Sequence, residues 1–258
     1  MTIQHTPVVR LIDIETSPLI GYAWQTFDTN ILKTLEPSKV ISFAWKDLNS
    51  ETTYVKCLAD YKGYKPNILN DELLIKEAWK ILDESDVLIA HFGDAFDFKK
   101  LNARFVYYGL NAPSFYQTID TKKAASKYFK FDSNSLNNLG HYLGVGQKIN
   151  NGGFELWVEC MAGDKDAWKR MAAYNCQDVV LLEQVYLKLR PFMATHPDLN
   201  QIAENGTEPA CSTCMSHNIQ KRGFSLTKMG RKQRYQCSDC GSWSVGPWIK
   251  NKVMTNEG

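Results

Sequence analysis

A short apolar segment near the N-terminus contains two acidic residues, and it constrains the fold more than any other stretch of the chain. The segment VVRLIDIETSP spans residues 8–18, and its aliphatic residues are typical of a buried strand. Asp13 and Glu15 lie inside this strand, two residues apart. Alternate strand residues point to the same face, with Cα atoms roughly 6.5–7 Å apart. The pattern therefore predicts a buried strand that presents two carboxylates at one place.

Length and composition are those of a globular protein. The 258 residues are enough for one ordinary domain and a small appendage. The contents of 44% hydrophobic and 22% charged residues exclude a disordered or membrane-embedded chain. No apolar run approaches the ~20 residues that span a bilayer, and the N-terminus lacks the apolar core of a signal peptide. We therefore expect a cytoplasmic protein with no membrane partner.

The order of the predicted elements indicates an α/β fold with a mixed sheet. Strands come first and strand–helix alternation follows, which is typical of this class. The longest helix is expected over 165–192, with a candidate break around Asn175. The polar segment 195–210 has the composition of a linker, so we expect domains at 1–194 and 211–258. The other expected elements are strands at 8–15, 40–48, 52–59 and 86–92, helices at 71–85, 96–109 and 135–145, and a strand entering a helix within 114–129.

Two further acidic positions lie where a site in such a fold is expected. Asp97 begins a helix after a buried strand, at the strand end where α/β folds bind ligands. Tyr174 and Asp178 are four residues apart, so they share one side of a helix. Each position also has a plain structural interpretation: edge-strand charges for Asp13 and Glu15, a helix cap for Asp97, and core or solvated helix residues for the last pair. Their order and spacing together favour one metal site.

Three motifs carry a resemblance to a known family, and they occur in the order Asp13-x-Glu15, Phe96-Asp97 and Tyr174-x-x-x-Asp178. This pattern resembles the DEDDy 3′–5′ exonucleases, in the phage-type branch of the ribonuclease H-like superfamily. The resemblance covers roughly residues 8–192. It implies a ribonuclease H-like mixed sheet flanked by helices. One position departs from the family pattern, because Phe92 stands where an asparagine is usual. This difference affects the expected orientation of a substrate more than it affects metal binding.

The resemblance also implies a chemistry. The acidic residues would bind two Mg²⁺ or Mn²⁺ ions, and they are Asp13, Glu15, Asp97 and Asp178. Tyr174 would orient the attacking water. We therefore expect a metal-dependent 3′–5′ exonuclease acting on nucleic acid, with single-stranded DNA preferred over RNA, in the host cytoplasm if the protein is phage-encoded. The alternatives are a ribonuclease, a structure-specific endonuclease, or a weakly active protein that binds or recruits nucleic acid.

Other residues near the motifs are weaker candidates. In NNGGFELW, residues 150–157, two glycines permit close backbone approach, and Phe154 is a candidate for stacking on a base. The alternative is a turn followed by core aromatics, which we favour for Trp157. Asp120 follows an expected strand and is a candidate neighbour of the site, whereas Asp94 is expected in a loop. Three lysines form a basic helix start that faces either phosphate or solvent: Lys122, Lys123 and Lys127.

The C-terminal region contains two C-x₂-C pairs separated by 22 residues, formed by Cys211, Cys214, Cys237 and Cys240. Such paired turns are typical of tetrahedral zinc sites. The phrase RYQCSDCGSW resembles zinc ribbons of transposase-like and other nucleic-acid proteins. We therefore expect one structural Zn²⁺ in a zinc ribbon over 211–258. The alternatives are redox-active disulfide pairs or unligated thiols.

Positive charge is concentrated in this C-terminal segment. From Cys211 onward the chain carries a net charge of +6, whereas the preceding residues carry −4. Clustered cations bind phosphate backbones through counterion release. The expected nucleic-acid-binding residues are Lys221, Arg222, Arg231, Lys232 and Arg234, with stacking contributed by exposed aromatic residues among Phe224, Tyr235, Trp243 and Trp248. The alternative is a ribbon that docks a protein or only closes the C-terminus.

Overall fold

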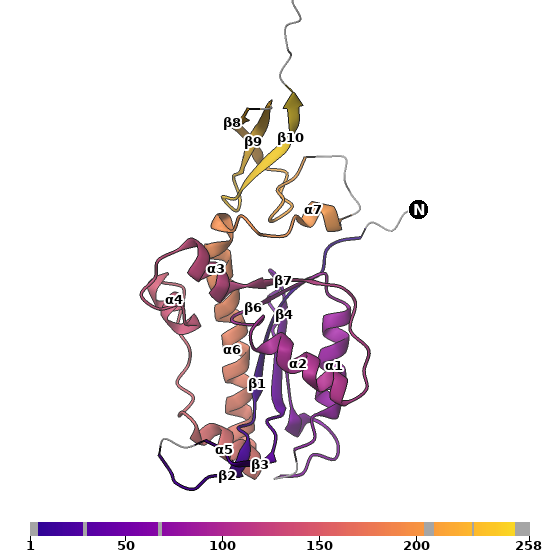
Figure 1. Ribbon diagram of the computed structural model, residues 1–258, viewed down its shortest axis with the longest axis vertical. Coiled ribbons are helices and arrows are strands. Elements are labelled where there is room, and N and C mark those ends of the chain that lie inside the picture. The colour runs from indigo at the N-terminus through magenta and orange to yellow at the C-terminus, as the bar shows by residue number, and fades with distance from the viewer. Residues whose placement is uncertain (1–4, 28–29, 67–68, 204–208, 229, 251–258) are drawn as a thin grey trace, which may run out of the picture. The chain divides into compact units, whose positions relative to one another are not determined.

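The computed structural model describes residues 5–27, 30–66, 69–203, 209–228 and 230–250 (Figure 1). The chain forms two compact units. The larger spans Val8–Tyr186, and the smaller comprises the sections of chain that precede and follow it. None of the helices in the described ranges combines the length and the apolar character that a bilayer crossing requires.

A five-stranded mixed sheet forms the centre of the larger unit, with strand order β5-β4-β1-β6-β7. Its strands are β1 (Val9–Thr16), β4 (Val40–Asp47), β5 (Tyr54–Cys57), β6 (Val87–Ala90) and β7 (Gln117–Asp120). Strand β1 pairs antiparallel with β4 and parallel with β6. The sheet therefore confirms the predicted mixed α/β class. The strand expected at 52–59 is shorter, because the 3₁₀ turn η1 (Leu58–Asp60) follows Cys57.

Strand β1 presents its two acidic residues on the face opposite to that of Ile12 and Ile14. Ile12 and Ile14 are buried and belong to the hydrophobic core together with Phe43 and Leu74. Asp13 occupies the alternate register position, opposite Ala44 of β4, and so projects from the other face. The period of two residues thus lets one strand both close the core and present carboxylates.

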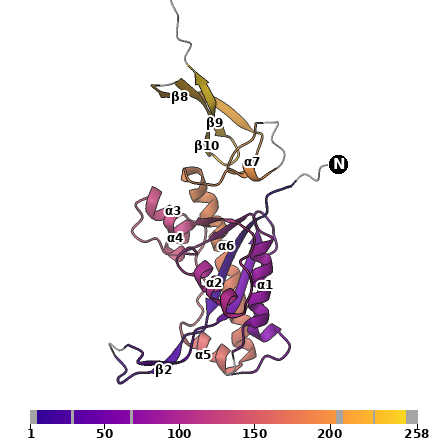
Figure 2. The same ribbon diagram turned by 45° about the vertical axis from the view of Figure 1, so that its right-hand side comes forward.

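Helices flank both faces of this sheet. They are α1 (Glu72–Asp83), α2 (Asp97–Tyr107), α3 (Thr121–Tyr128), α4 (Leu136–Tyr142), α5 (Glu155–Ala162) and α6 (Lys165–Leu189). Figures 1 and 2 show α1 and α2 on one side of the sheet and α6 on the other. The expected break around Asn175 is wrong, because α6 continues through it. Asn175 is fully buried, and its side-chain amide hydrogen-bonds to Ser42 and Asp13, so tertiary contacts satisfy a residue that otherwise disfavours helix interiors.

Two elements of the larger unit lie outside the sequence expectations. A hairpin of β2 (Ile20–Tyr22) and β3 (Lys33–Glu36) follows the first strand of the sheet. The segment 150–157, for which either close backbone approach with Phe154 stacking on a base or a turn followed by core aromatics was expected, enters helix α5. Gly152 and Gly153 both have positive φ, 82° and 75°. These glycines serve the left-handed backbone rather than close approach, because a Cβ at either position would meet nothing nearer than 4.0 Å.

The smaller unit contains a three-stranded antiparallel sheet, in the order β10-β9-β8. Its strands are β8 (Ile219–Thr227), β9 (Gly230–Cys237) and β10 (Trp243–Lys250). The 3₁₀ turn η2 (Arg190–Phe192) and the short helix α7 (Leu199–Ile202) precede the sheet in sequence. Helix α7 thus forms within the segment 195–210 that was expected as a linker, of which 204–208 lie outside the described residues.

Buried ion pairs hold the helices on both sides of the larger sheet. On the α1 side, Arg104 of α2 pairs with Asp71 through two hydrogen bonds, and Asp71 also accepts the Val40 amide of β4 at 3.0 Å. On the α6 side, Lys46 of β4 pairs with Glu183 of α6. All four charged side chains are at most 8% exposed. Removing one partner of such a pair leaves an uncompensated buried charge.

We predict that Arg104→Met lowers the free energy of unfolding by about 3–5 kcal/mol, because Asp71 then remains buried without its cation. Urea denaturation measures this change. The matched control is Lys76→Met, which removes an i,i+4 pair whose side chains are 50% and 41% exposed and is expected to cost at most about 0.5 kcal/mol. Equal losses in the two variants would contradict this role of the buried pair.

Candidate metal centres

Three of the sequence-predicted acidic residues converge on the α6 side of the sheet. Asp13 and Glu15 come from β1, and Asp178 comes from α6, which runs alongside β1 in both views (Figures 1 and 2). One carboxylate oxygen from each residue lies within 4.8 Å of the others. Such a group of hard oxygen donors fits Mg²⁺ or Mn²⁺.

The fourth acidic residue, Asp97, adjoins this group. It is the first residue of α2 and is 3% exposed. Asp97 follows the end of strand β6 at Ala90. The Ile14 amide of β1 donates to Asp97 Oδ1 at 3.2 Å. The negative charge of Asp97 is one of the groups that raise the pKa of Asp13, so the two carboxylates interact. The fold thus brings together all four predicted acids, three in one tight group and Asp97 beside it.

Burial and mutual repulsion oppose ionisation of these carboxyl groups. Burial raises the pKa of Asp13 well above its usual value, and the charges of Asp97, Glu15 and Asp178 raise it further. Burial and then Asp178 raise the pKa of Glu15 to about 8. Burial raises the pKa of Asp97 to about 7. Groups with such pKa values require nearby cations to be fully ionised at neutral pH.

Lys148 supplies one cation that the sequence analysis missed. It lies between α4 and α5, and its Nζ donates to Asp178 Oδ2 at 2.5 Å and to the Tyr174 hydroxyl at 3.0 Å. The other oxygen of Asp178, Oδ1, is buried and has no hydrogen-bond partner among the described residues. A buried acceptor of this kind is costly unless something binds it. The residues present therefore fit a divalent cation.

Tyr174 lies beside the acidic group, one helical turn from Asp178. Its ring packs edge-on against Trp157 at 6.1 Å between centroids, which agrees with the interpretation of Trp157 as a packed aromatic. Burial, followed by the charge of Asp178, raises the pKa of Tyr174 to about 12. The hydroxyl group therefore keeps its proton at neutral pH and can donate a hydrogen bond, but it is a poor base.

A series of hydrogen bonds from Asn175 and Ser42 orients the Asp13 side chain. Asn175 Nδ2 donates to Asp13 Oδ2 at 2.6 Å, and Asn175 Oδ1 accepts the Ser42 hydroxyl at 2.7 Å. Ser42 in turn accepts from the Cys57 thiol at 3.5 Å. These contacts orient one oxygen of Asp13. The sequence signal for Asn175 was a polar residue inside a helical stretch, and it was interpreted as a break.

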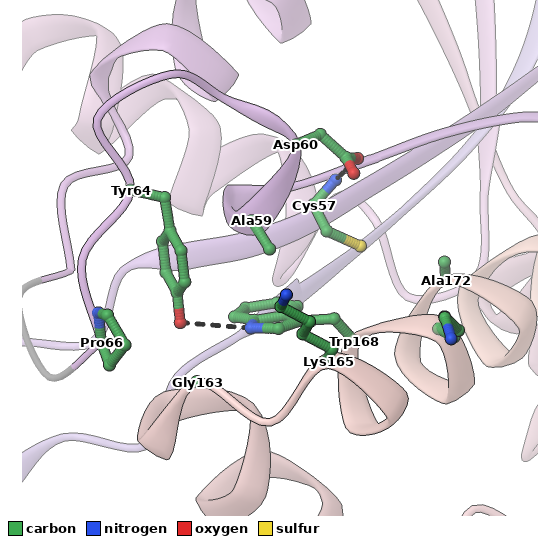
Figure 3. Close-up of a pocket in the computed structure, with 10 residues that line it drawn as sticks. Cys57, Ala59, Asp60, Tyr64, Pro66, Gly163, Lys165, Trp168 and Ala172 are labelled. Carbon is green, nitrogen blue, oxygen red and sulfur yellow. Dashed lines mark hydrogen bonds between the residues drawn. The ribbon is translucent and has the colours of Figure 1, made fainter.

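Cys57, the last residue in this series of hydrogen bonds, also lines a separate cavity of about 460 Å³ (Figure 3). Tyr64 and Trp168 form part of its wall, and the Trp168 indole N–H donates to the Tyr64 hydroxyl at 3.1 Å. Asp60, Lys165 and Lys169 are its charged lining residues. None of the clustered acids lines this cavity.

Phe92, which stands where asparagine is usual in the family that the sequence resembles, has a left-handed backbone. Its φ is 68°, in the region where asparagine is enriched, and the residue is 44% exposed. Its amide donates to Asp120 Oδ1 at 3.0 Å, and Lys122 Nζ lies 3.9 Å from its ring centroid. Asp120 also accepts the amides of Asp94, Lys122 and Lys123, so it fixes this loop and caps α3.

The other lysines of this helix start have local partners. Lys123 pairs with Asp94 at 2.7 Å, and Lys127 lies over the Tyr128 ring. Phe154 lies apart from them, at the N-cap of α5, and is 65% exposed. With Thr16 and Trp157 it lines an open groove of about 490 Å³. Trp157 also packs against Tyr174, which lies one helical turn from Asp178, so this groove lies near the acidic group.

The four C-terminal cysteines form a second candidate metal centre. Their sulfur atoms lie within 4.8 Å of one another, with Cys211–Cys240 at 3.6 Å and Cys214–Cys237 at 3.7 Å. Four ligands at about 2.3 Å in a tetrahedron are separated by about 3.8 Å, whereas a disulfide requires about 2.05 Å. All four cysteines are free, so the arrangement fits a tetrahedral metal ion and not a disulfide.

The two C-x₂-C turns have matching backbone geometry. In each, the residue after the second cysteine has positive φ, 61° at Met215 and 78° at Gly241. The amide of that residue donates to the carbonyl of the first cysteine, at 2.8 Å and 3.1 Å. Each first cysteine also donates its amide to the carbonyl five residues ahead. Such repetition indicates that both turns are shaped to aim two sulfur atoms at one centre.

The predicted nucleic-acid-binding cations lie on β8 and β9. Lys221, Arg222, Arg231 and Arg234 are exposed, and Lys232 is half-buried. Lys232 and Arg234 share one face of the sheet, whereas Arg231 lies on the other. The sequence placed the charge correctly on this unit, but the division between two faces depends on strand register.

Comparisons with known proteins agree with the fold. No curated protein matches the sequence. Among solved structures, the family B DNA polymerase from the hyperthermophilic archaeon Pyrobaculum calidifontis is similar, with a TM-score of 0.53 and 17% identity over 72% of this chain. The match spans only 25% of that polymerase chain, and at this identity it shows the fold alone. A family model described as RNase_H superfamily matches residues 38–190. The chain therefore belongs to the RNase H superfamily.

Proposed function

We propose that the protein is a metal-dependent nuclease that removes nucleotides from 3′ ends, in the manner of DEDDy exonucleases. The convergence of Asp13, Glu15 and Asp178 within 4.8 Å, with Asp97 beside them, is the observation that carries this proposal. Membership of the RNase H superfamily supports nucleic acid as the substrate. Single-stranded DNA is the substrate that we propose first.

The four carboxylates would hold two Mg²⁺ or Mn²⁺ ions, which activate water and stabilise the charge that develops on phosphate oxygens. Asn175 occupies one oxygen of Asp13, so the other would be available to bind an ion. Tyr174 would donate a hydrogen bond from its hydroxyl group to position the attacking water or the phosphate. Lys148 contacts both Tyr174 and Asp178, and it would pair with a non-bridging phosphate oxygen.

The groove beside the carboxylates would hold the terminal nucleotides. Phe154 is exposed there, and an exposed aromatic ring stacks on an unpaired base. The C-terminal unit, with zinc bound by its four cysteines, would add affinity through its cations. A small sheet of this size has little core of its own, so we propose that metal binding drives its folding.

The direct test uses single-stranded DNA labelled at its 5′ end, incubated with Mn²⁺ or with EDTA. A ladder of shortened products that requires Mn²⁺ is expected, and it should disappear when the 3′ end is blocked. One internal cut would indicate an endonuclease, and shortening of RNA alone would indicate a ribonuclease. Binding without cleavage in any metal would identify a recruitment protein and overturn the proposal.

We predict that Asp13→Asn or Asp178→Asn lowers the cleavage rate by about 10²–10³-fold or more, because each change removes a charged ligand of the ions. Gel-based rates measure the loss, and circular dichroism checks that the fold persists. Asp166→Asn is the matched control, since Asp166 lies on the same helix as Asp178 but is 82% exposed. Wild-type turnover by either acidic-site variant would remove the assignment.

We also predict that the metal-free protein loses stability as pH rises from about 6 to 8. The folded-state pKa values of Glu15 and Asp97 are raised to about 8 and 7, whereas in the unfolded chain these groups ionise near pH 4. The folded state therefore binds more protons over this interval, and its stability falls with pH. Mn²⁺ should raise Tm more at pH 8 than at pH 6, because it replaces these protons.

Differential scanning fluorimetry at several pH values tests this dependence. The Glu15→Gln variant is the control, because it removes one raised pKa and should flatten the change of Tm with pH. A Tm of the metal-free wild-type protein that rises between pH 6 and 8 would contradict the electrostatic account of the site.

For the cysteine centre, we predict that Cys237→Ser releases the bound zinc and weakens nucleic-acid binding in a salt-dependent manner. Serine cannot replace a thiolate ligand, so the ribbon should lose its fold. Metal analysis and binding titrations at two salt concentrations measure both effects. Cys160→Ser is the comparison, since Cys160 is buried in the larger unit; a zinc content in Cys237→Ser equal to that of Cys160→Ser would contradict the assignment.

A further inference from the structure

The three-stranded C-terminal sheet has exposed apolar side chains on both of its faces. The large ones with at least 36% exposure are Phe224, Leu226, Trp243, Val245, Trp248 and Ile249. A small sheet with two uncovered apolar faces indicates that at least one of them meets a ligand or partner. The residues on each face indicate which kind of ligand that face could bind.

Strand register separates these residues into two sets. Opposite residues of an antiparallel pair share a face, and β9 is continuous through Lys232 and Arg234. Trp248 lies opposite Lys232, and Val245 lies opposite Arg234. Trp243, opposite Gln236, belongs to the same set. We name this surface, formed by Trp243, Val245, Trp248, Lys232 and Arg234, the indole face.

The other surface has a different character. Leu226 lies opposite Arg231 across the β8–β9 pair, and Ile249 lies opposite Arg231 across the β9–β10 pair. Phe224 is on the same side, with the Arg231 guanidinium 4.2 Å from its ring centroid. We name this surface, formed by Phe224, Leu226, Ile249 and Arg231, the aliphatic face. Tyr235 and Lys221, which lie opposite each other, share this side. Tyr235 is half-buried, whereas the two tryptophans of the indole face are both exposed.

Each indole of the indole face has its own cation. Lys232 Nζ lies 4.6 Å from the Trp248 ring centroid, and Arg234 Cζ lies 5.6 Å from that of Trp243. Trp243 and Trp248 are 51% and 50% exposed, so about half of each residue's surface is open to solvent. Four residue steps separate their positions on β9, which corresponds to about 13 Å along the strand. The segments of β8, β9 and β10 contain no aspartate or glutamate, so no strand residue neutralises these cations.

We propose that the indole face binds single-stranded nucleic acid, with unpaired bases stacked on Trp243 and Trp248 and phosphates paired with Lys232 and Arg234. This inference rests on the proposed nuclease function, because it assigns the C-terminal unit a grip on the same class of substrate. Stacking requires a free base face, which a duplex keeps inside its helix, so the indoles select unpaired strands. In the bound state the two cations leave the rings and pair with the backbone.

The test measures binding apart from cleavage. The full zinc-loaded chain carries Asp178→Asn, so that the acidic site does not degrade the probe, and fluorescence anisotropy follows its titration with fluorescein-labelled dT and rU oligonucleotides. Trp243→Ala and Trp248→Ala are each expected to weaken binding about 10-fold, by loss of one stacked base. Matched controls on the aliphatic face, Phe224→Ala and Leu226→Ala, are expected to bind within twofold of the parent.

Salt dependence distinguishes the aromatic from the charged residues. Lys232→Ala is expected to reduce the slope of log K against log salt by about 0.7, the value for one phosphate contact on a single strand. The tryptophan variants should leave the slope unchanged while lowering the affinity. Trp243→Phe and Trp248→Phe keep a ring and are expected to recover part of the affinity, and a zinc assay verifies that each variant retains its metal.

Three results would overturn the proposal. The first is parental affinity in both zinc-loaded tryptophan variants, and the second is an equal or larger loss in the aliphatic-face variants. The third is competition by duplex DNA as effective as that by single strands. Comparable binding of dT and rU would show that the face binds unpaired strands of either sugar. Binding of only one of them would show whether the ligand is DNA or RNA. Failure of cleavage by the wild-type protein, with tryptophan-dependent binding retained, would overturn the proposed nuclease function and leave this site standing.

Discussion

Repulsion among carboxylates gathered on one face of a buried strand is the constraint on which the rest of the structure depends. Asp13, Glu15 and Asp178 place oxygens within 4.8 Å of one another. At that distance and an effective dielectric constant near 20, each like-charge pair costs about 3.5 kcal/mol. Three such pairs approach the whole stability of a typical domain, which is about 5–15 kcal/mol. The arrangement therefore makes physical sense only with protons or cations present, and Lys148 supplies only one of the positive charges required.

The surrounding scaffold holds these groups together against that repulsion. Strand β1 contributes to the core through Ile12 and Ile14, so its acidic face cannot rotate away without disrupting the core. Asn175 fixes Asp13, and the Ile14 amide fixes Asp97. Buried ion pairs on both sides of the sheet secure the helices that carry the remaining groups. These contacts fix the carboxylates from several sides, an arrangement that suits the strict geometry of Mg²⁺ better than that of a flexible calcium loop.

Local patterns in the sequence predicted the parts of the site that depend on short-range geometry. The two-residue period of a strand places Asp13 and Glu15 together, and the C-x₂-C spacing places two sulfur atoms per turn. Lys148 could not be predicted in the same way, because its contact with Asp178 depends on the path of the chain between α4 and α5. Asn175 was misinterpreted as a helix break, since its hydrogen bonds to Ser42 and Asp13 join segments more than 130 residues apart.

A crystal structure of the protein grown with Mn²⁺, with anomalous data collected at the manganese edge, would show directly whether the carboxylates bind metal ions. We expect anomalous peaks bounded by Asp13, Glu15, Asp97 and Asp178, with the Lys148 ammonium displaced from Asp178. Crystals grown in saturating Mn²⁺ that show no manganese at these carboxylates, and in which Lys148 is still bonded to Asp178, would contradict this role of the site.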